Sequence, residues 1–222
     1  MTLRPTLAAV TMAALPSGAL AHPHVFIDAA LSLVYDDQGR LSEVAVEWEY
    51  DDFYSFLIIE DMGLDPDGDG VLTPEEQAAI QDFDADWEEG FDGRLYLGVE
   101  GRRVALQAPR DFGADYRDGR LVSRHVRPLA APLDGALPLL VQVYDPEFYV
   151  QFAIPDTPVI QGADCAADLR PGDPFASADA YARAVADALD SGIATEAEQE
   201  MLVVDIGSIG ADAVHVQCEG AP

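Results

Sequence analysis

Residues 65–76 carry acidic side chains at the spacing with which proteins bind calcium. Asp65, Asp67 and Asp69 occupy the first, third and fifth positions of a loop of the EF-hand type. Glu76 occupies the last position, from which both carboxylate oxygens can bind one ion. An acidic turn with glycine is the plain alternative in a chain so rich in Asp and Glu. Because that alternative does not account for the whole pattern, we predict a calcium-binding loop.

The other positions of this loop need no charge. Gly70 permits a sharp turn, and Val71 is expected to contribute only its backbone carbonyl to the ion. Thr73 is expected to hold a ligand water or to cap the next helix. Gln77 stands where an apolar residue is usual, so we expect weaker packing of the helix that leaves the loop. The loop is unpaired in the sequence, which favours a structural calcium site over a signalling switch.

The first 21 residues have the pattern of a secretory signal peptide. Arg4 is their only charged residue, residues 7–15 form a short apolar run, and Ala21 ends a small-x-small cleavage site. A core helix is the alternative. We predict export with cleavage after Ala21. We expect no membrane span in the mature chain, because no later apolar stretch is long enough.

Cleavage there would place His22 at the mature N-terminus. An α-amine with an N-terminal imidazole can chelate Cu²⁺, Ni²⁺ or Zn²⁺, and His24 adds a nearby nitrogen. In an extended chain His22, His24 and Asp28 point to the same side. The alternative is an N-terminus that binds no metal, and spacing alone does not separate the two. His125 and His215 are isolated in strand-like segments and are interpreted as core or surface groups.

Two cysteines remain in the mature chain, Cys165 and Cys218. In an oxidising compartment an even pair most simply forms one disulfide, which here would tie the C-terminus to a much earlier segment. Metal ligation and two free buried thiols are the alternatives. The chain has no Cys-x-x-Cys motif that would support a metal site.

The charge of the chain excludes several classes of partner. The sequence has 41 acidic residues against 12 basic ones, all of them Arg, and its net charge is -29. Such a chain repels nucleic acid and anionic lipid and attracts cations. No catalytic Ser/His/Asp order, Gly-rich phosphate loop or nucleophilic Cys setting is present, so we do not expect an enzyme. A copper-dependent enzyme that uses the N-terminal histidine is the less favoured alternative.

Hydrophobic periodicity predicts an α+β fold. Strands are expected at residues 25–35, 41–50, 94–99, 103–107, 121–126, 139–144, 201–206 and 213–218. Helices are expected at residues 52–62, 74–89 and 176–189. This pattern predicts a signal peptide, a mostly antiparallel β unit with an inserted helix–loop–helix, and a C-terminal portion with a helix and strands. Their ranges are residues 1–21, 22–155 with an insertion at about 52–90, and 156–222.

Four features together resemble an uncharacterised family of bacterial periplasmic proteins, domain of unknown function one thousand and seven. They are residues 21–28 (Ala-His-Pro-His-Val-Phe-Ile-Asp), residues 48–55 (Trp-Glu-Tyr-Asp-Asp-Phe-Tyr-Ser), the acidic loop, and residues 144–149 (Tyr-Asp-Pro-Glu-Phe-Tyr). The resemblance implies a periplasmic accessory of metal transport, because such proteins are often encoded beside nickel, cobalt or zinc permeases. An inner-membrane metal permease is therefore the implied partner.

Two functions are consistent with these features. In the first, the chain is an exported calcium-binding protein that also binds or delivers a divalent transition metal for a membrane transporter. In the second, calcium stabilises a structural or interaction protein that has no transition-metal role.

Overall fold

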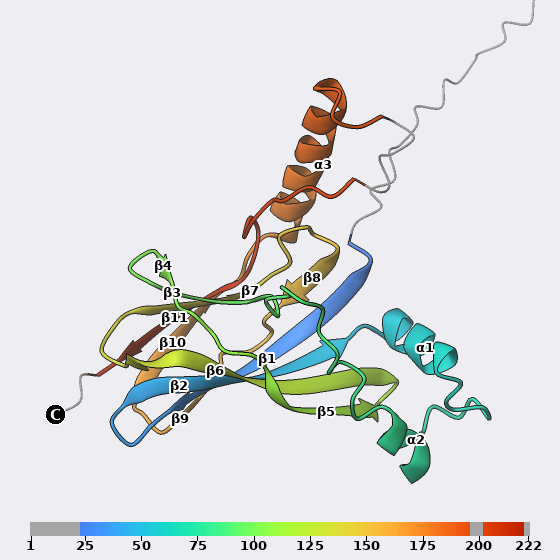
Figure 1. The fold of residues 1–222 in the computed structure, drawn as a ribbon, viewed down its shortest axis with the longest axis horizontal. Helices are drawn as coiled ribbons and strands as arrows, with labels where there is room; N and C mark the ends of the chain where they lie inside the picture. The colour runs from blue at the N-terminus through green and yellow to red at the C-terminus, as the bar shows by residue number, and fades with distance from the viewer. Residues whose placement is uncertain (1–22, 196–201, 220–222) are drawn as a thin grey trace, which may run out of the picture.

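Two β-sheets make up most of the protein in the computed structural model, which describes residues 23–195 and 202–219 (Figure 1). The first sheet has the strand order β5–β6–β2–β1–β8, and β9 also pairs with β1. Its strands are β1 (Val25–Tyr35), β2 (Arg40–Tyr50), β5 (Arg110–Arg117), β6 (Arg120–Asp134), β8 (Val150–Ala153) and β9 (Val159–Gln161).

The second sheet combines strands from the middle and the end of the chain. Its order is β10–β11–β7–β3–β4. The strands are β3 (Leu95–Val99), β4 (Arg102–Arg103), β7 (Leu139–Val143), β10 (Cys165–Arg170) and β11 (Ala213–Cys218). Since β11 pairs with β7, the C-terminal part of the chain shares a sheet with the middle part.

The inner faces of both sheets form one core. Alternate side chains of β1 and β2 point inward, so that Leu31 lies opposite Val46 in the antiparallel ladder. Leu33 from the first sheet and Leu97 and Val214 from the second are almost completely buried in the same cluster. Burial of one face of each sheet therefore holds the two layers together.

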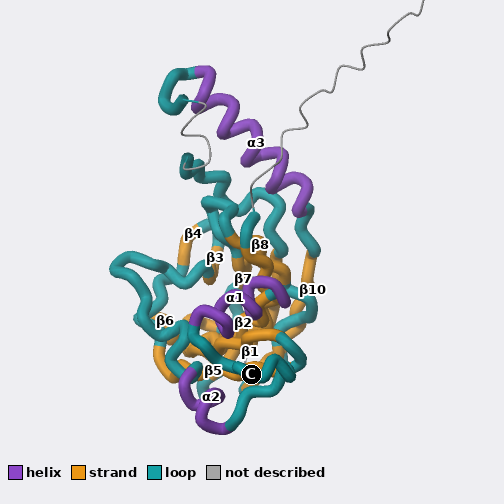
Figure 2. The backbone as a smooth tube through the Cα atoms, turned by 90° about the vertical axis from the view of Figure 1, so that its right-hand side faces the viewer, coloured by secondary structure: helices purple, strands orange, loops and turns teal. Residues whose placement is uncertain are grey.

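The described residues contain three helices, α1 (Asp52–Asp61), α2 (Pro74–Ala79) and α3 (Pro174–Asp190). Figure 1 shows α1 and α2 together at one end of the first sheet, near β5. Figure 2 shows α3 extending away from the sheets, and its base packs in a small cluster with Phe148 and Ile206. No helix in residues 23–195 or 202–219 is both long and apolar enough to cross a membrane.

The predicted α+β class is wrong, because the fold is mostly β. The helix expected at residues 74–89 ends at Ala79, and Ile80 after it is completely buried. The following segment is rich in Asp, which forms helices poorly. It runs back over the first sheet, where Trp87 stacks on Trp48 at 6.3 Å between ring centroids.

Several strands also differ from those predicted. The strand expected at residues 103–107 is limited to β4, and residues 202–206 form no strand. The strands β5, β8, β9 and β10 were not expected. The strand β5 is polar, whereas β8, β9 and β10 are short and pair with strands far away in the sequence. Residue 201 and the predicted signal peptide lie outside the described residues.

The predicted disulfide is confirmed. Cys165 and Cys218 are bonded, and they face each other in the register of β10 and β11. The bond therefore joins the two strands at one end of their ladder.

Candidate metal centre

The acidic loop lies between the C-terminus of α1 and the capped N-terminus of α2. At the end of α1 away from the loop, the Asp51 carboxylate caps the helix by accepting the backbone N–H of Tyr54 at 2.8 Å. At the far end of the loop, Thr73 caps α2 in a capping box with Glu76. Pro74 occupies the first turn of α2, where its missing N–H costs little. The capping box therefore determines where the chain leaves the loop.

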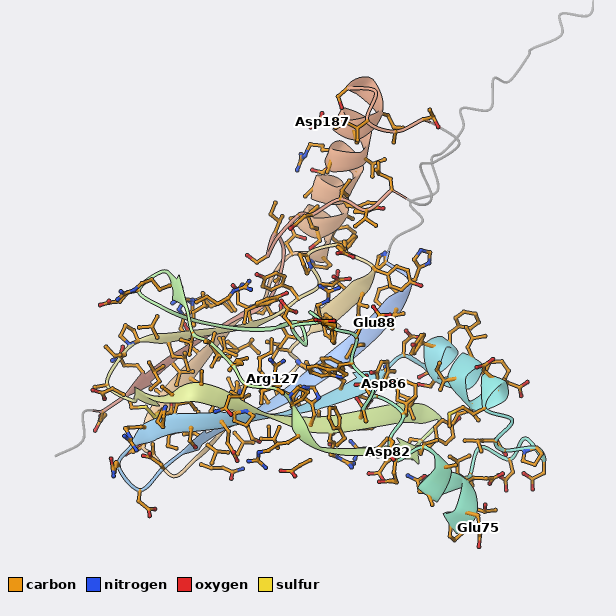
Figure 3. All side chains as sticks on the ribbon, viewed as in Figure 1. Glu75, Asp82, Asp86, Glu88, Arg127 and Asp187 are labelled. Carbon is orange, nitrogen blue, oxygen red and sulfur yellow. A yellow bond between two sulfur atoms is a disulfide. The ribbon has the colours of Figure 1, made fainter. Side chains whose placement is uncertain are left out.

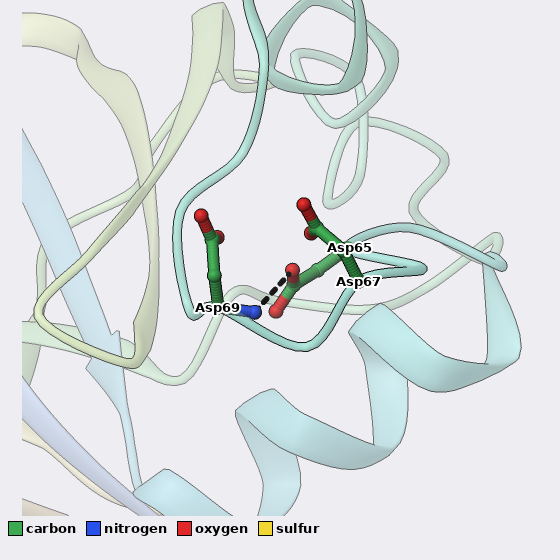
Figure 4. A group of neighbouring side chains, drawn as sticks. All are labelled: Asp65, Asp67 and Asp69. Atoms are coloured by element: carbon green, nitrogen blue, oxygen red, sulfur yellow. Dashed lines mark hydrogen bonds between the residues drawn. The ribbon is translucent and has the colours of Figure 1, made fainter.

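Three carboxylates of the loop converge. Ligand oxygens of Asp65, Asp67 and Asp69 lie within 4.8 Å of one another (Figure 4). The Asp65 carboxylate accepts the backbone N–H groups of Asp69 and Gly70, each at 3.0 Å. Gly70 has φ +78°, a left-handed conformation that suits glycine. The backbone of the loop thus fixes the first carboxylate at the centre of the turn.

Glu76 connects the two ends of the loop. Its Oε1 accepts the backbone N–H of Asp65 at 3.2 Å. Its Oε2 accepts both the backbone N–H and the hydroxyl of Thr73, each at 2.8 Å. Glu76 does not belong to the group of three converging aspartates. The Val71 side chain is 67% exposed, so its backbone carbonyl is the group that can face an ion.

The electrostatics of the loop fit a hard divalent cation. The negative charge of Asp69 raises the pKa of the Asp67 carboxyl. Hydrogen bonds from the backbone N–H and hydroxyl of Thr73 lower the pKa of Glu76. No Arg among the described residues forms an ion pair with the three aspartates. A set of mutually repelling oxygen donors is the kind that Ca²⁺ binds.

Gln77 attaches α2 to the first sheet. Its side-chain amide donates to the Asp115 carboxylate at 3.0 Å and to the Ala114 carbonyl at 3.3 Å. Its side-chain carbonyl oxygen accepts a hydrogen bond from the backbone N–H of Tyr116 at 3.3 Å. The sequence predicts weak packing of α2, because Gln77 lacks the apolar side chain that is usual at this position. In the structure it replaces apolar packing with three hydrogen bonds to β5.

The residues proposed for a transition metal are only partly described. His24 is exposed at the start of β1, and its ring centroid lies 4.8 Å from that of Tyr149. Asp28 lies further along β1 and forms an ion pair with Arg120 at 3.6 Å. Four residues of extended chain separate His24 and Asp28 by about 13 Å, too far for one ion. His22 lies outside the described residues.

The other two histidines lie apart from this end of β1. His125 is 1% exposed, its ring centroid is 4.9 Å from that of Trp87, and neither ring nitrogen has a hydrogen-bond partner in the described part of the chain. Burial, with a smaller effect of the Arg127 charge, lowers the pKa of His125 to about 3. His215 is exposed on β11, opposite Asp168 of β10.

Asp84 is a half-buried acid that was not predicted from the sequence. It lies in the segment between α2 and β3, along which Figure 3 labels Asp82, Asp86 and Glu88. Its carboxylate accepts hydrogen bonds from the hydroxyls of Ser123 at 2.9 Å and Tyr50 at 3.3 Å. Burial raises the pKa of Asp84 to about 6. The sequence carries no signal that separates Asp84 from its exposed neighbours.

Asp84→Asn is expected to stabilise the protein at pH 7. Folding raises the pKa of this carboxyl from 3.8 to about 6. Its ionisation therefore lowers the stability of the folded protein as the pH rises through that range. The cost above pH 6 is about 3 kcal/mol at most. The stability gained by the variant should therefore increase between about pH 4 and pH 6 and then stay constant, as measured by urea unfolding at several pH values. Asp82→Asn, an exposed acid in the same segment, should show no such increase. A variant less stable than the original at pH 7 would contradict this assignment.

Comparison with known proteins gives one family. The family model described as "Protein of unknown function (DUF1007)" matches residues 7–218. No curated protein matches the chain.

Proposed function

The chain belongs to this DUF1007 family, whose description assigns no activity, and we propose from the geometry of the acidic loop that it is a calcium-binding protein. The observation that carries the proposal is the convergence of Asp65, Asp67 and Asp69 within 4.8 Å. Glu76 would add a carboxylate from the start of α2, and Val71 would add a backbone carbonyl. Thr73 would contribute through a ligand water.

A structural role for the ion agrees with the way the loop is attached. The loop joins α1 to α2, and Gln77 binds α2 to β5. A cation shared by the aspartates and Glu76 would hold the two helix ends together and relieve the repulsion among the carboxylates. We therefore assign calcium the role of a brace at this end of the first sheet.

Calorimetric titration tests this proposal. The protein, freed of metal with a chelator, is expected to bind one Ca²⁺ per chain. Asp67→Asn combined with Asp69→Asn removes two of the converging charges and should weaken binding at least about tenfold. Asp61→Asn, an exposed acid just before the loop, is the matched control and should change the affinity little. Binding that survives the double substitution would place the ion elsewhere.

A transition-metal role is the second part of the proposal. The observation that favours it is the exposed His24 imidazole at the start of β1, three residues after the predicted end of the signal peptide. With His22 as the mature N-terminus, the two imidazoles and the α-amine would bind Zn²⁺, Ni²⁺ or Cu²⁺. Asp28, being paired with Arg120, would act outside the ligand set. The disulfide is compatible with an exported protein, and we place the protein in the periplasm as an accessory of a metal permease.

The same titration has a second stage. Calcium-saturated mature protein is titrated with Zn²⁺, Ni²⁺ and Cu²⁺, and binding that His24→Ala abolishes supports the transition-metal role. His215→Ala, which changes an exposed histidine on the other sheet, is the control. No heat of binding with any of the three ions would leave calcium-stabilised structure as the function.

A further inference from the structure

The outer face of α1 is apolar and exposed. Phe53 is 68% exposed, Phe56 54% and Leu57 45%, and helical spacing places all three on one side. The opposite side is occupied by Ser55 and Ile59, which are buried against the first sheet. The helix therefore carries large apolar side chains on the side that does not pack against the sheet.

Phe26 extends this apolar area beyond the helix. It is 51% exposed at the start of β1. Its N–H donates to the Asp51 carboxylate at 2.8 Å, and its carbonyl accepts the Asp51 N–H at 2.9 Å, so Phe26 lies beside the first turn of α1. We call Phe26, Phe53, Phe56 and Leu57 the α1 patch. An exposed area that gathers three aromatic side chains is typical of a protein-binding site, because aromatic anchors dominate binding energy.

The surroundings of the α1 patch are mostly acidic, and Arg120, which lies beside the start of α1, is already paired with Asp28, Glu49 and Asp52. Glu60 and Asp61 end the helix, and in the described part of the chain neither forms an ion pair. The sequence has no basic residue between Arg40 and Arg94. After Met62, Gly63 and Leu64 the chain continues into the carboxylates of the acidic loop. A partner that covers the patch must therefore tolerate or match negative charge at its rim.

We propose that the α1 patch docks a basic, apolar segment of a partner protein. An apolar centre would bury the three phenylalanines, and basic residues around it would pair with Glu60 and Asp61. A second copy of this chain is a poor occupant, because each copy has a net charge of -29 and brings the same acidic rim. Anionic lipid is repelled for the same reason. The proposal does not rest on calcium binding.

Peptide binding tests the proposal. The probe is a fluorescently labelled helical peptide of about 18 residues in which Leu and Lys are placed to give one apolar and one basic face. Anisotropy at physiological ionic strength should show binding. Phe53→Ser with Phe56→Ser should weaken it about tenfold or more, because it removes apolar anchors and leaves every charge in place. Phe175→Ser, which changes an 82% exposed residue of α3, should have no effect.

Other outcomes would overturn the proposal. Equal binding of a Lys/Ser peptide of the same charge would show a general attraction to the acidic chain. Equal loss with Phe175→Ser would show that the patch has no special role. A dimer in sedimentation velocity, or binding to phosphatidylcholine vesicles, that disappears with the Phe53/Phe56 substitutions would assign the patch to a second copy or to a lipid surface. Unchanged thermal unfolding of each variant confirms that the fold is retained.

Discussion

Glu76→Ala is expected to abolish the rise in melting temperature that calcium gives this protein. Glu76 is the loop residue that reaches back from α2, where its carboxylate accepts hydrogen bonds from the backbone of Asp65 and Thr73. As the last ligand of the loop it would couple the ion to α2. Without it, the three aspartates remain but no longer connect the ion to the exiting helix.

The expected size follows from binding linkage. Calcium at a hundredfold excess over its dissociation constant stabilises a protein by about 2.7 kcal/mol. For a chain of this size that corresponds to a rise of roughly 8 °C. Scanning calorimetry with calcium and with a chelator measures the rise directly. Trp87, in the segment after α2, stacks on Trp48, so the fluorescence of these two tryptophans gives a second readout.

The comparison needs a control for the lost helix cap. Glu76→Ala also removes the capping box and should cost about 1 kcal/mol even with a chelator present. The decisive quantity is therefore the difference between the melting temperatures with and without calcium. Glu75→Gln, a change of a neighbouring exposed acid outside the ligand positions, should keep the whole rise. A full rise in Glu76→Ala would mean that Glu76 is not a ligand.

The acidic loop could be predicted from sequence because its geometry is local. Asp65, Asp67 and Asp69 alternate within a few residues, and a glycine that permits positive φ follows them. Their convergence needs no distant contact. The hairpin of β1 and β2 was predictable for a similar reason, since alternation of apolar and polar residues determines which face is buried.

The attachments of the loop could not be predicted, because they depend on residues far away in the sequence. Gln77 forms hydrogen bonds to Ala114 and Asp115. Asp84 accepts hydrogen bonds from Ser123 and Tyr50. Nothing near Gln77 or Asp84 in the chain signals these partners. The residue at which α2 ends could not be predicted either, because it also depends on distant contacts. Burial of the following segment over the first sheet outweighs the helical periodicity of that segment. The helix expected at residues 74–89 therefore overestimated the helical part of the fold.

These attachments give the calcium site a consequence beyond the loop. The ion would fix the start of α2, Gln77 would transmit that constraint to β5, and the segment after α2 would hold Trp87 over His125. On the other side of the loop, α1 carries Phe53, Phe56 and Leu57, the helical part of the α1 patch. A calcium brace would therefore also hold the proposed docking helix in place.

Removal of the disulfide is expected to cause the largest loss of stability at a site away from the loop. Cys165 and Cys218 are 53 residues apart in the sequence. Closing a loop of that length restricts the unfolded chain, and the entropy model gives about 4 kcal/mol. Cys165→Ala with Cys218→Ala should therefore lower the melting temperature by roughly 10 °C. Reduction of the original protein by dithiothreitol should produce the same decrease.

The location of the loss distinguishes this effect from general destabilisation. The strand β10 lies at the edge of the second sheet and pairs only with β11 among the described strands, so hydrogen exchange should quicken there first. The calcium-dependent rise should persist in the double variant, because α1, the loop and α2 pack against the first sheet. An unchanged melting temperature would mean that strand pairing alone orders this end of the chain. A loss of the calcium response would mean that the calcium site depends on the disulfide for its folded geometry.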